Sequence, residues 1–285
     1  MASIKLKHSG GNGVIIAAPT SNPASDKTLT LPSDVDGTVV SKDSSNSLQN
    51  IAGINGGQLG NRNLIINGAM QVAQRGTTET GVNSSGYKNA PDRWTHQIAS
   101  SQSAYTVSQS TDSPDGFGNS YKIDVTTADT SLHADHAHFF RQKIEGQNLQ
   151  GFAKGTSAAK QFELSFYVKT TKTGTYVVEL YDIDNSRQIS KTYTVSDTNW
   201  NRYTVTFPAD TTGAFGNDNG ASLAVQFWLS AGSNYTSGTL NSSAWASSTQ
   251  ANRVVGQVNF DDSTSNDWYL TGVQLEVGSV ATDFE

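Results

Sequence analysis

Short runs in which apolar and polar residues alternate with a period of two constrain the fold of this 285-residue chain more than any other feature. Successive side chains of a β-strand point to opposite faces, so each run defines one apolar and one polar face. Gly, Asn, Ser and Asp residues separate the runs, as turn formers do. Almost no segment has the period of a helix. The sequence therefore predicts an all-β protein.

The clearest alternation lies between residues 162 and 277, and it assigns each residue to a face. The residues predicted to face the core are Phe162, Leu164, Phe166, Val168, Tyr176, Val178, Leu180, Tyr203, Val205, Phe207, Leu223, Val225, Phe227, Leu229, Tyr269, Val273 and Leu275. Those predicted to face outward are Glu163, Ser165, Tyr167, Val177, Glu179, Tyr181, Arg202, Thr204, Thr206, Ala224, Gln226, Trp228, Trp268, Gln274 and Glu276. Residues 62–70 and 270–278 are expected to be strands that pair at the two ends of the domain. Together the runs predict an antiparallel β-sandwich of the jelly-roll type.

The aromatic residues divide the chain into two parts. All 26 Phe, Trp and Tyr residues lie from Tyr87 onward, and residues 1–60 contain only short β-like pieces at 4–7, 14–17, 29–31 and 37–40. Such a segment buries too little surface to fold alone, and its regular β-branched pieces favour completion by other chains over disorder. We expect a β-rich attachment and oligomerisation segment over residues 1–42, a Ser-, Asn- and Gly-rich connector over 43–61, and the jelly roll over 62–285.

Six segments together carry a family resemblance. They are residues 62–70, 92–94, 141–145, 164–169, 199–203 and 270–278. In this order and spacing they resemble the carbohydrate-binding jelly-roll modules of marine phage tail fibres, and residues 1–60 resemble the N-terminal attachment segments of cyanophage fibre proteins. The resemblance implies a tail fibre or receptor-binding protein of a virion. It would be a homotrimer that attaches to other virion proteins through its N-terminal segment and contacts host-surface polysaccharide through its jelly roll.

Composition argues against several other classes of protein. The net charge of −6, without clustered Lys and Arg, argues against nucleic-acid binding. No apolar run approaches the roughly 20 residues that span a bilayer, so we expect no membrane insertion. The absence of cysteine excludes disulfides, thiolate metal sites and cysteine nucleophiles. Glycine motifs for phosphate or dinucleotide binding are also absent, and no cofactor is expected.

The outward faces of the predicted strands suggest a glycan site. Aromatic rings stack on the C–H face of a sugar, and amide and guanidinium groups bind its hydroxyls. The candidates are three rings and three polar side chains: Tyr167, Tyr181, Trp228, Arg141, Gln226 and Gln274. If the strands pair as in the resembling family, these side chains share one face. The competing interpretation is that the other sheet, a loop or a neighbouring subunit covers that face.

Two sets of residues are weak candidates for metal ligands. His136 and His138 lie on one side of an extended strand and could share an ion, but a single such pair also fits a polar strand entrance. In similar modules acids near the first and last strands hold calcium, and residues 270–273 lack the Asp pair expected there. The acids at 182–185 and 261–262 are equally ordinary turn residues. No bound metal is expected.

Two alternatives to glycan recognition stay open. A purely structural virion protein, such as a capsid decoration, head fibre or baseplate component, would bury its aromatic face against neighbouring subunits. A glycan-cleaving enzyme would need two carboxylates about 5 to 10 Å apart across a cleft, for which Glu163 and Glu179 are candidates by face. The sequence has neither a nucleophile-elbow motif nor the helical repeat of depolymerising tailspikes. We therefore expect no catalysis.

Overall fold

The computed structural model describes residues 3–7, 10, 13–17 and 62–285. The chain divides into two units, Met1–Ile54 and Asn55–Glu285. In the first unit, β1 (Ser3–Lys7) and β2 (Gly13–Ala17) form an antiparallel hairpin, which confirms the strands predicted at 4–7 and 14–17. The strands predicted at 29–31 and 37–40 and the connector at 43–61 lie outside the described residues.

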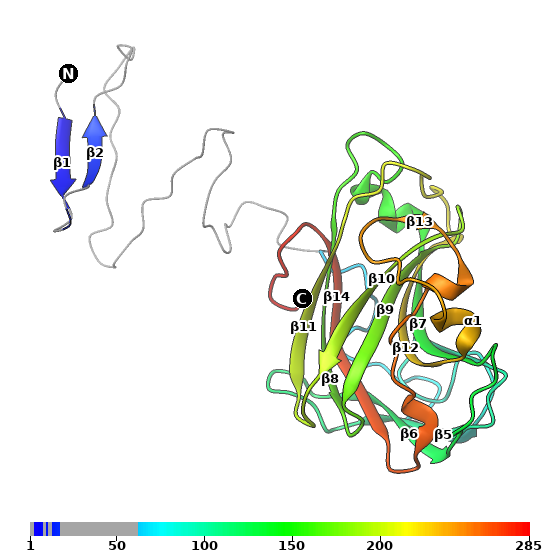
Figure 1. Ribbon diagram of the computed structural model, residues 1–285. Helices are drawn as coiled ribbons and strands as arrows, with labels where there is room; N and C mark the ends of the chain where they lie inside the picture. Colours follow the sequence, from blue (N-terminus) through cyan, green and yellow to red (C-terminus); the bar gives the residue numbers. More distant parts are fainter. Residues whose placement is uncertain (1–2, 8–9, 11–12, 18–61) are drawn as a thin grey trace. The chain divides into compact units, whose positions relative to one another are not determined.

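Two six-stranded antiparallel sheets form a sandwich in the second unit (Figure 1), which confirms the predicted fold class. The first sheet has the order β13 (Ala246–Ser247), β10 (Arg187–Val195), β9 (Gly174–Asp182), β12 (Ala221–Ala231), β7 (Ala137–Glu145) and β4 (Thr95–Ala99). The second has the order β11 (Asn201–Phe207), β8 (Phe162–Thr170), β14 (Asp267–Val277), β6 (Ser120–Thr127), β5 (Ala104–Ser110) and β3 (Thr78–Val82).

Helices are short throughout the described part of the chain. They are the 3-10 helices η1 (Gly146–Phe152), η2 (Gln250–Asn252) and η3 (Phe260–Asp262) and the α-helix α1 (Ser233–Thr236). None of the described helices is long and apolar enough to cross a membrane.

The core lies between the two sheets and is rich in aromatic rings. Trp94 stacks on Phe140 with ring centroids 4.9 Å apart, and Phe227 contacts Phe166 and Trp268 at 5.0 and 6.1 Å. Full burial of each such side chain contributes about 1.5–3 kcal/mol to folding. The inward residues predicted for the β8, β9, β11 and β12 runs all lie in or against this core, so their face assignments are confirmed.

The last strand departs from the predicted alternation. Trp268 lies in the core and Tyr269 outside it, the reverse of the sequence-based assignment. The cause is a β-bulge in β14 at Gly272, whose φ is 60°. The bulge adds one residue and inverts the phase of the strand, so Val273 and Leu275 face the core as predicted while the residues before Gly272 are reversed.

Residues 62–70 form turns and not the predicted strand. The side chain of Asn63 accepts hydrogen bonds from the backbone N–H groups of Ile65 and Leu275, at 2.9 and 3.2 Å. Asn67 adopts a left-handed conformation with φ of 58°. Side-chain bonds of this kind compete with a strand ladder. The segment still lies beside β14, because the Leu64 N–H donates to the Leu275 carbonyl at 3.0 Å.

Candidate functional site

Residues 232–258 cover part of the outer face of the first sheet. In Figure 1, α1 lies beside β12, and its Tyr235 ring contacts Trp228 with centroids 5.3 Å apart. Val254 is fully buried in a small cluster with Trp228, Phe139 and Val177. The outer face of β9 and β12 therefore has its own apolar layer, which closes it to solvent around Trp228.

A buried ion pair anchors this covering segment to the sheet. Arg253 Nε and Nη2 donate to the two carboxylate oxygens of Glu179, both at 2.8 Å, and Trp228 Nε1 donates to the same carboxylate at 2.9 Å. The guanidinium also lies 5.1 to 5.7 Å from the ring centroids of Trp228, Tyr181 and Tyr235. Burial opposes the charge of Arg253, but Glu179 outweighs burial and raises the pKa of Arg253.

The covering segment corrects the prediction of an open face. Trp228 is fully buried and Gln226 is 1% exposed, so neither is accessible to a sugar. Tyr181 is half-buried beside Arg253. Arg141, from the adjacent strand β7, lies beyond the covered part and lines an open hollow. Of the alternatives that the sequence left open, coverage by a loop is the one observed for β9 and β12.

The other two candidates, Tyr167 and Gln274, lie on the opposite side of the molecule, on the outer face of the second sheet. Gln274 is fully buried under the C-terminal residues. Its Nε2 donates to the Thr282 hydroxyl at 3.0 Å, and its Oε1 accepts from the Glu285 N–H at 2.9 Å. Tyr167 is half-buried and packs on Phe117 at 5.2 Å. The C-terminal residues thus cover this face near Gln274, and the six predicted residues form no common surface.

The two carboxylates considered for glycan cleavage share no cleft. Glu163 is on β8 of the second sheet and Glu179 is on β9 of the first, so their outward side chains lie on opposite faces of the sandwich. Both are buried, at 3% and 0% exposed. Burial raises the pKa of Glu163. Hydrolysis by this pair is incompatible with the fold.

The two weak metal candidates are partners of one aspartate. His136 Nε2 lies 3.0 Å and His138 Nδ1 lies 3.1 Å from the two carboxylate oxygens of Asp261, and all three side chains are fully buried. Burial would raise the pKa of Asp261, but the two histidines outweigh it and hold this pKa well below its usual value. Within the described residues, no three His, Asp or Glu side chains are arranged to hold a metal ion.

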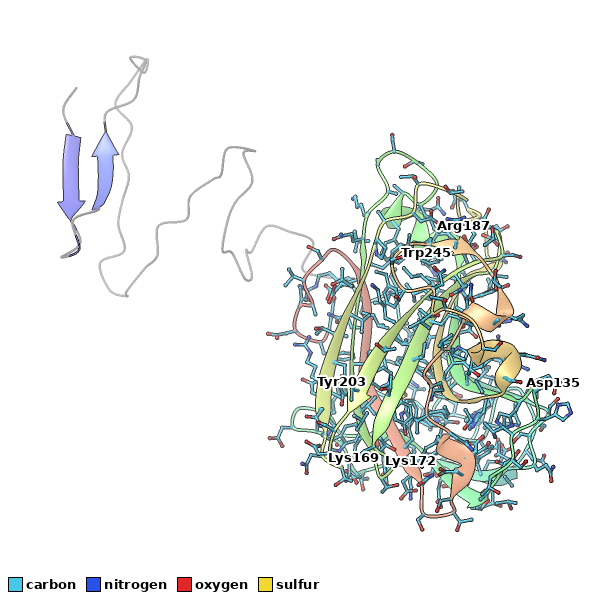
Figure 2. The ribbon with its side chains drawn as sticks, viewed as in Figure 1. Asp135, Lys169, Lys172, Arg187, Tyr203 and Trp245 are labelled. Atoms are coloured by element: carbon cyan, nitrogen blue, oxygen red, sulfur yellow. The ribbon has the colours of Figure 1, made fainter. Side chains whose placement is uncertain are left out.

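The calcium candidate Asp182 already has a cation. The buried ammonium of Lys154 donates to Asp182, lies 3.1 Å from Asp210 and donates to two backbone carbonyl groups. Arg187 binds Asp210 through two bonds of 2.8 and 3.0 Å and also donates to the carbonyl of Trp245. Figure 2 shows Arg187 and Trp245 together at this end of the sandwich. The carboxylates of Asp182 and Asp210 are therefore paired with cationic side chains.

An open groove lies beyond the edge of the covered face, around Tyr87. It consists of two adjoining hollows of about 390 and 300 Å³ that share Tyr87 and Arg93, and we call it the Tyr87 groove. The first hollow is lined in addition by Ile66, Asn67, Val72, Gln74, Arg75 and Asp92. The second is lined in addition by Ser85, Gly86, Thr95, His96, Arg141 and Lys143.

The core fixes the backbone of the groove. Trp94, stacked in the core, donates from Nε1 to the Asn67 carbonyl at 3.3 Å. The Asp92 N–H donates to the Val72 carbonyl at 2.8 Å, and Asp92 accepts from the Gln74 N–H at 2.9 Å. These bonds tie the loop before β4 to the turns at 66–75, so the walls of the groove are preformed.

Tyr87 presents its ring at the centre of the groove. Its neighbour Gly86 forms a β-bridge with His96 on the free edge of β4, with backbone bonds of 2.9 and 3.0 Å. Tyr87 is 54% exposed, and the guanidinium of Arg75 lies 4.5 Å from its ring centroid. Arg93, which lines both hollows, has a φ of 75°, a conformation that non-glycine residues rarely adopt.

Strand alternation does not reveal Tyr87, Arg75 and Arg93, because Tyr87 lies in a loop and the two arginines lie on turns. Two signals in the sequence point to them. Tyr87 is the first aromatic residue of the chain, and Arg93 lies in the segment 92–94 on which the family resemblance rests. The position of Tyr87 beside an edge strand could have identified it only once the strand order was known.

A larger hollow of about 490 Å³ lies elsewhere, between Arg62, Lys160 and Glu276. Its one aromatic lining residue, Phe152, is fully buried and presents no ring to solvent. Arg62 is paired with Glu285. We therefore consider the Tyr87 groove the better candidate site.

No family profile matches the sequence, and no curated protein does. Among solved structures, the enzymatically active domain of bacteriophage CBA120 tailspike protein 4 aligns over 76% of this chain with 15% identity and a TM-score of 0.40. The chain spans 22% of that protein's length. A family 4 carbohydrate-binding module aligns over 75% of this chain and 99% of its own, with 14% identity and a TM-score of 0.36. At such identities and TM-scores the likenesses carry no argument about function.

Substitution of Arg253 by Met should destabilise the protein by about 3–5 kcal/mol, because Glu179 is left as a buried carboxylate without its cation. Adding Glu179→Gln should recover part of this loss. Urea unfolding of the full chain measures both effects. The control is Arg62→Met, which breaks the half-exposed pair with Glu285 and should cost at most about 1 kcal/mol. Equal losses for the two arginines would contradict the anchoring role of Arg253.

Proposed function

We propose that the sandwich is a carbohydrate-binding module whose ligand lies in the Tyr87 groove. The observation that carries the proposal is the exposed ring of Tyr87 at the junction of two preformed hollows. An aromatic ring with polar groups on either side is the arrangement that sugars require, since the ring stacks on C–H groups while the polar groups bind hydroxyls.

The lining of the groove supplies these polar groups. Gln74 is in the first hollow and Thr95 is in the second, while the side chains of Asn67 and Ser85 are bonded to backbone groups and shape the walls. Arg75 lies over one face of the Tyr87 ring, so one sugar unit would stack on the other face and the next unit would lie in the adjoining hollow. The volumes of about 390 and 300 Å³ are in the lower range of small-molecule sites, which suits a short stretch of a polysaccharide.

The proposed biological role is host attachment by a virion tail fibre. Supporting it are the resemblance of the sequence and the division of the chain into a unit with a β-hairpin and a larger sandwich. One shallow groove binds a sugar weakly, and three copies on one trimer would raise the effective affinity through multivalency. The N-terminal unit would form the trimer and attach to other virion proteins.

Tyr87→Ala in the full chain should weaken glycan binding at least about tenfold, equivalent to about 1.4 kcal/mol, because the stacking surface is removed. Binding to a panel of immobilised polysaccharides measures the effect. The matched control is Tyr167→Ala, which removes a half-buried ring from the opposite sheet. Loss of binding in the Tyr167 variant and not in the Tyr87 variant would place the site on the other face.

The native mass of the full chain should be three times the 30.4 kDa of the monomer, and removal of residues 1–54 should give a monomer. Native mass spectrometry measures both. A monomeric full chain would contradict the trimeric fibre. A trimer that binds no polysaccharide would favour the purely structural virion protein.

A further inference from the structure

We propose that the glycan bound in the Tyr87 groove is acidic, and that Arg141 and Lys143 bind its anionic group. This inference rests on the proposed function and names the class of ligand. The anionic group is the carboxylate of a uronic acid or a sulfate ester, since either offers oxygens to a guanidinium and an ammonium.

The two cations, Arg141 and Lys143, line one hollow with the exposed ring, and the guanidinium of Arg141 lies 5.3 Å from the Phe139 ring centroid. They are two residues apart on β7, on its outer face, and both line the second hollow together with Tyr87. Thr95 pairs with Arg141 on the neighbouring edge strand β4 and adds a hydroxyl to the same wall. A sugar stacked on the ring of Tyr87 would therefore lie in a hollow that is also lined by two cationic side chains.

Neither cation has an acidic partner among the described residues. Ten of the fifteen Lys and Arg side chains in residues 62–285 form ion pairs, and Arg141 and Lys143 are two of the five that do not. Glu145 follows on the same face of β7 but is paired with Arg93 at 3.1 Å. The groove thus carries two uncompensated positive charges on a protein whose net charge is −6.

Without a bound anion, the surroundings of Arg141 and Lys143 disfavour the charged forms of both side chains. Burial and the charge of Arg253 lower the pKa of Arg141. Burial and the charge of Arg141 lower the pKa of Lys143. The buried Nε of Arg141 has no hydrogen-bond acceptor, while its Nη2 donates to Gln97 at 3.2 Å. An anionic group bound beside both side chains would relieve the repulsion between the two charges.

The remaining charges of the groove do not compete for this anion. Arg75 is paired with Asp92 at 3.2 Å and lies over Tyr87, where it holds the ring. Each group therefore has a separate role. The Tyr87 ring stacks on the sugar, and the amides and hydroxyls bind its hydroxyl groups. Arg141 and Lys143 bind the anionic group and so favour charged glycans.

The test is binding of the full chain to immobilised polygalacturonate, its methyl-esterified form, carrageenan and neutral galactan. The wild type should bind at least one anionic member and should bind the neutral members at least about tenfold more weakly. Preference for polygalacturonate identifies a carboxylate, and preference for carrageenan identifies a sulfate. Raising NaCl from about 50 to about 500 mM should weaken binding, because salt screens charges at the surface.

The double variant Arg141→Gln with Lys143→Gln should lose the anionic preference. Lys143→Gln alone, at an exposed position, serves if the double variant does not fold. The matched control is Lys160→Gln with Lys191→Gln, which removes two other unpaired cations, and the same charge, away from the groove.

The outcomes separate the two proposals. Binding to the neutral members that needs Tyr87 but not Arg141 and Lys143 would overturn the acidic ligand and keep the glycan site. An equal loss in the Lys160 and Lys191 variant would reveal nonspecific attraction to polyanions and overturn the inference. No binding to any member by a folded wild type would contradict both proposals.

Discussion

The buried ion pair between Glu179 and Arg253 fixes the segment that covers one outer face of the sandwich, and it thereby determines which part of the first sheet stays accessible to solvent. Two stacked sheets have two outer faces, and each offers a row of alternate side chains to solvent or to a covering segment. The bond from Arg253 to Glu179 holds residues 232–258 against the face of β9 and β12. Trp228 on this face is buried in an apolar cluster beneath that segment. The C-terminal residues cover the opposite sheet through Gln274. The border of the first sheet stays open, and the Tyr87 groove lies there.

That border combines a rigid base with an exposed groove. The groove is built on an edge strand, β4, and on turns held by Trp94 from within the core. Its walls can therefore keep their positions without a ligand, which lowers the entropic cost of binding. The left-handed backbone of Arg93 is the local strain that this anchoring maintains. The proposed glycan recognition at Tyr87 and the proposed charge selection at Arg141 both depend on this placement.

The sequence predicted the fold class and most inward residues, because alternation depends only on local geometry. Alternation gave wrong results where a bulge shifts the strand by one residue, as at Gly272. It also gave wrong results where a side chain binds the backbone groups that a neighbouring strand would bind, as at Asn63. β5, β6 and β10 were not among the predicted runs, although Tyr121, Ile123 and Val125 of β6 alternate with polar residues and lie in the core. The candidate site was harder to predict from the sequence. Residues 232–258 cover Trp228, and no local sequence pattern reveals such a long-range contact.

The most direct test of the central claim is hydrogen–deuterium exchange of the full chain with and without the anionic polysaccharide that it binds best. Slower exchange is expected in peptides that contain residues 85–97 and 141–143, which include residues that line the groove. Exchange around Gln274 and Trp228 should not change. Protection confined to those covered faces, with none around Tyr87, would contradict the account and would mean that a ligand displaces the covering segments.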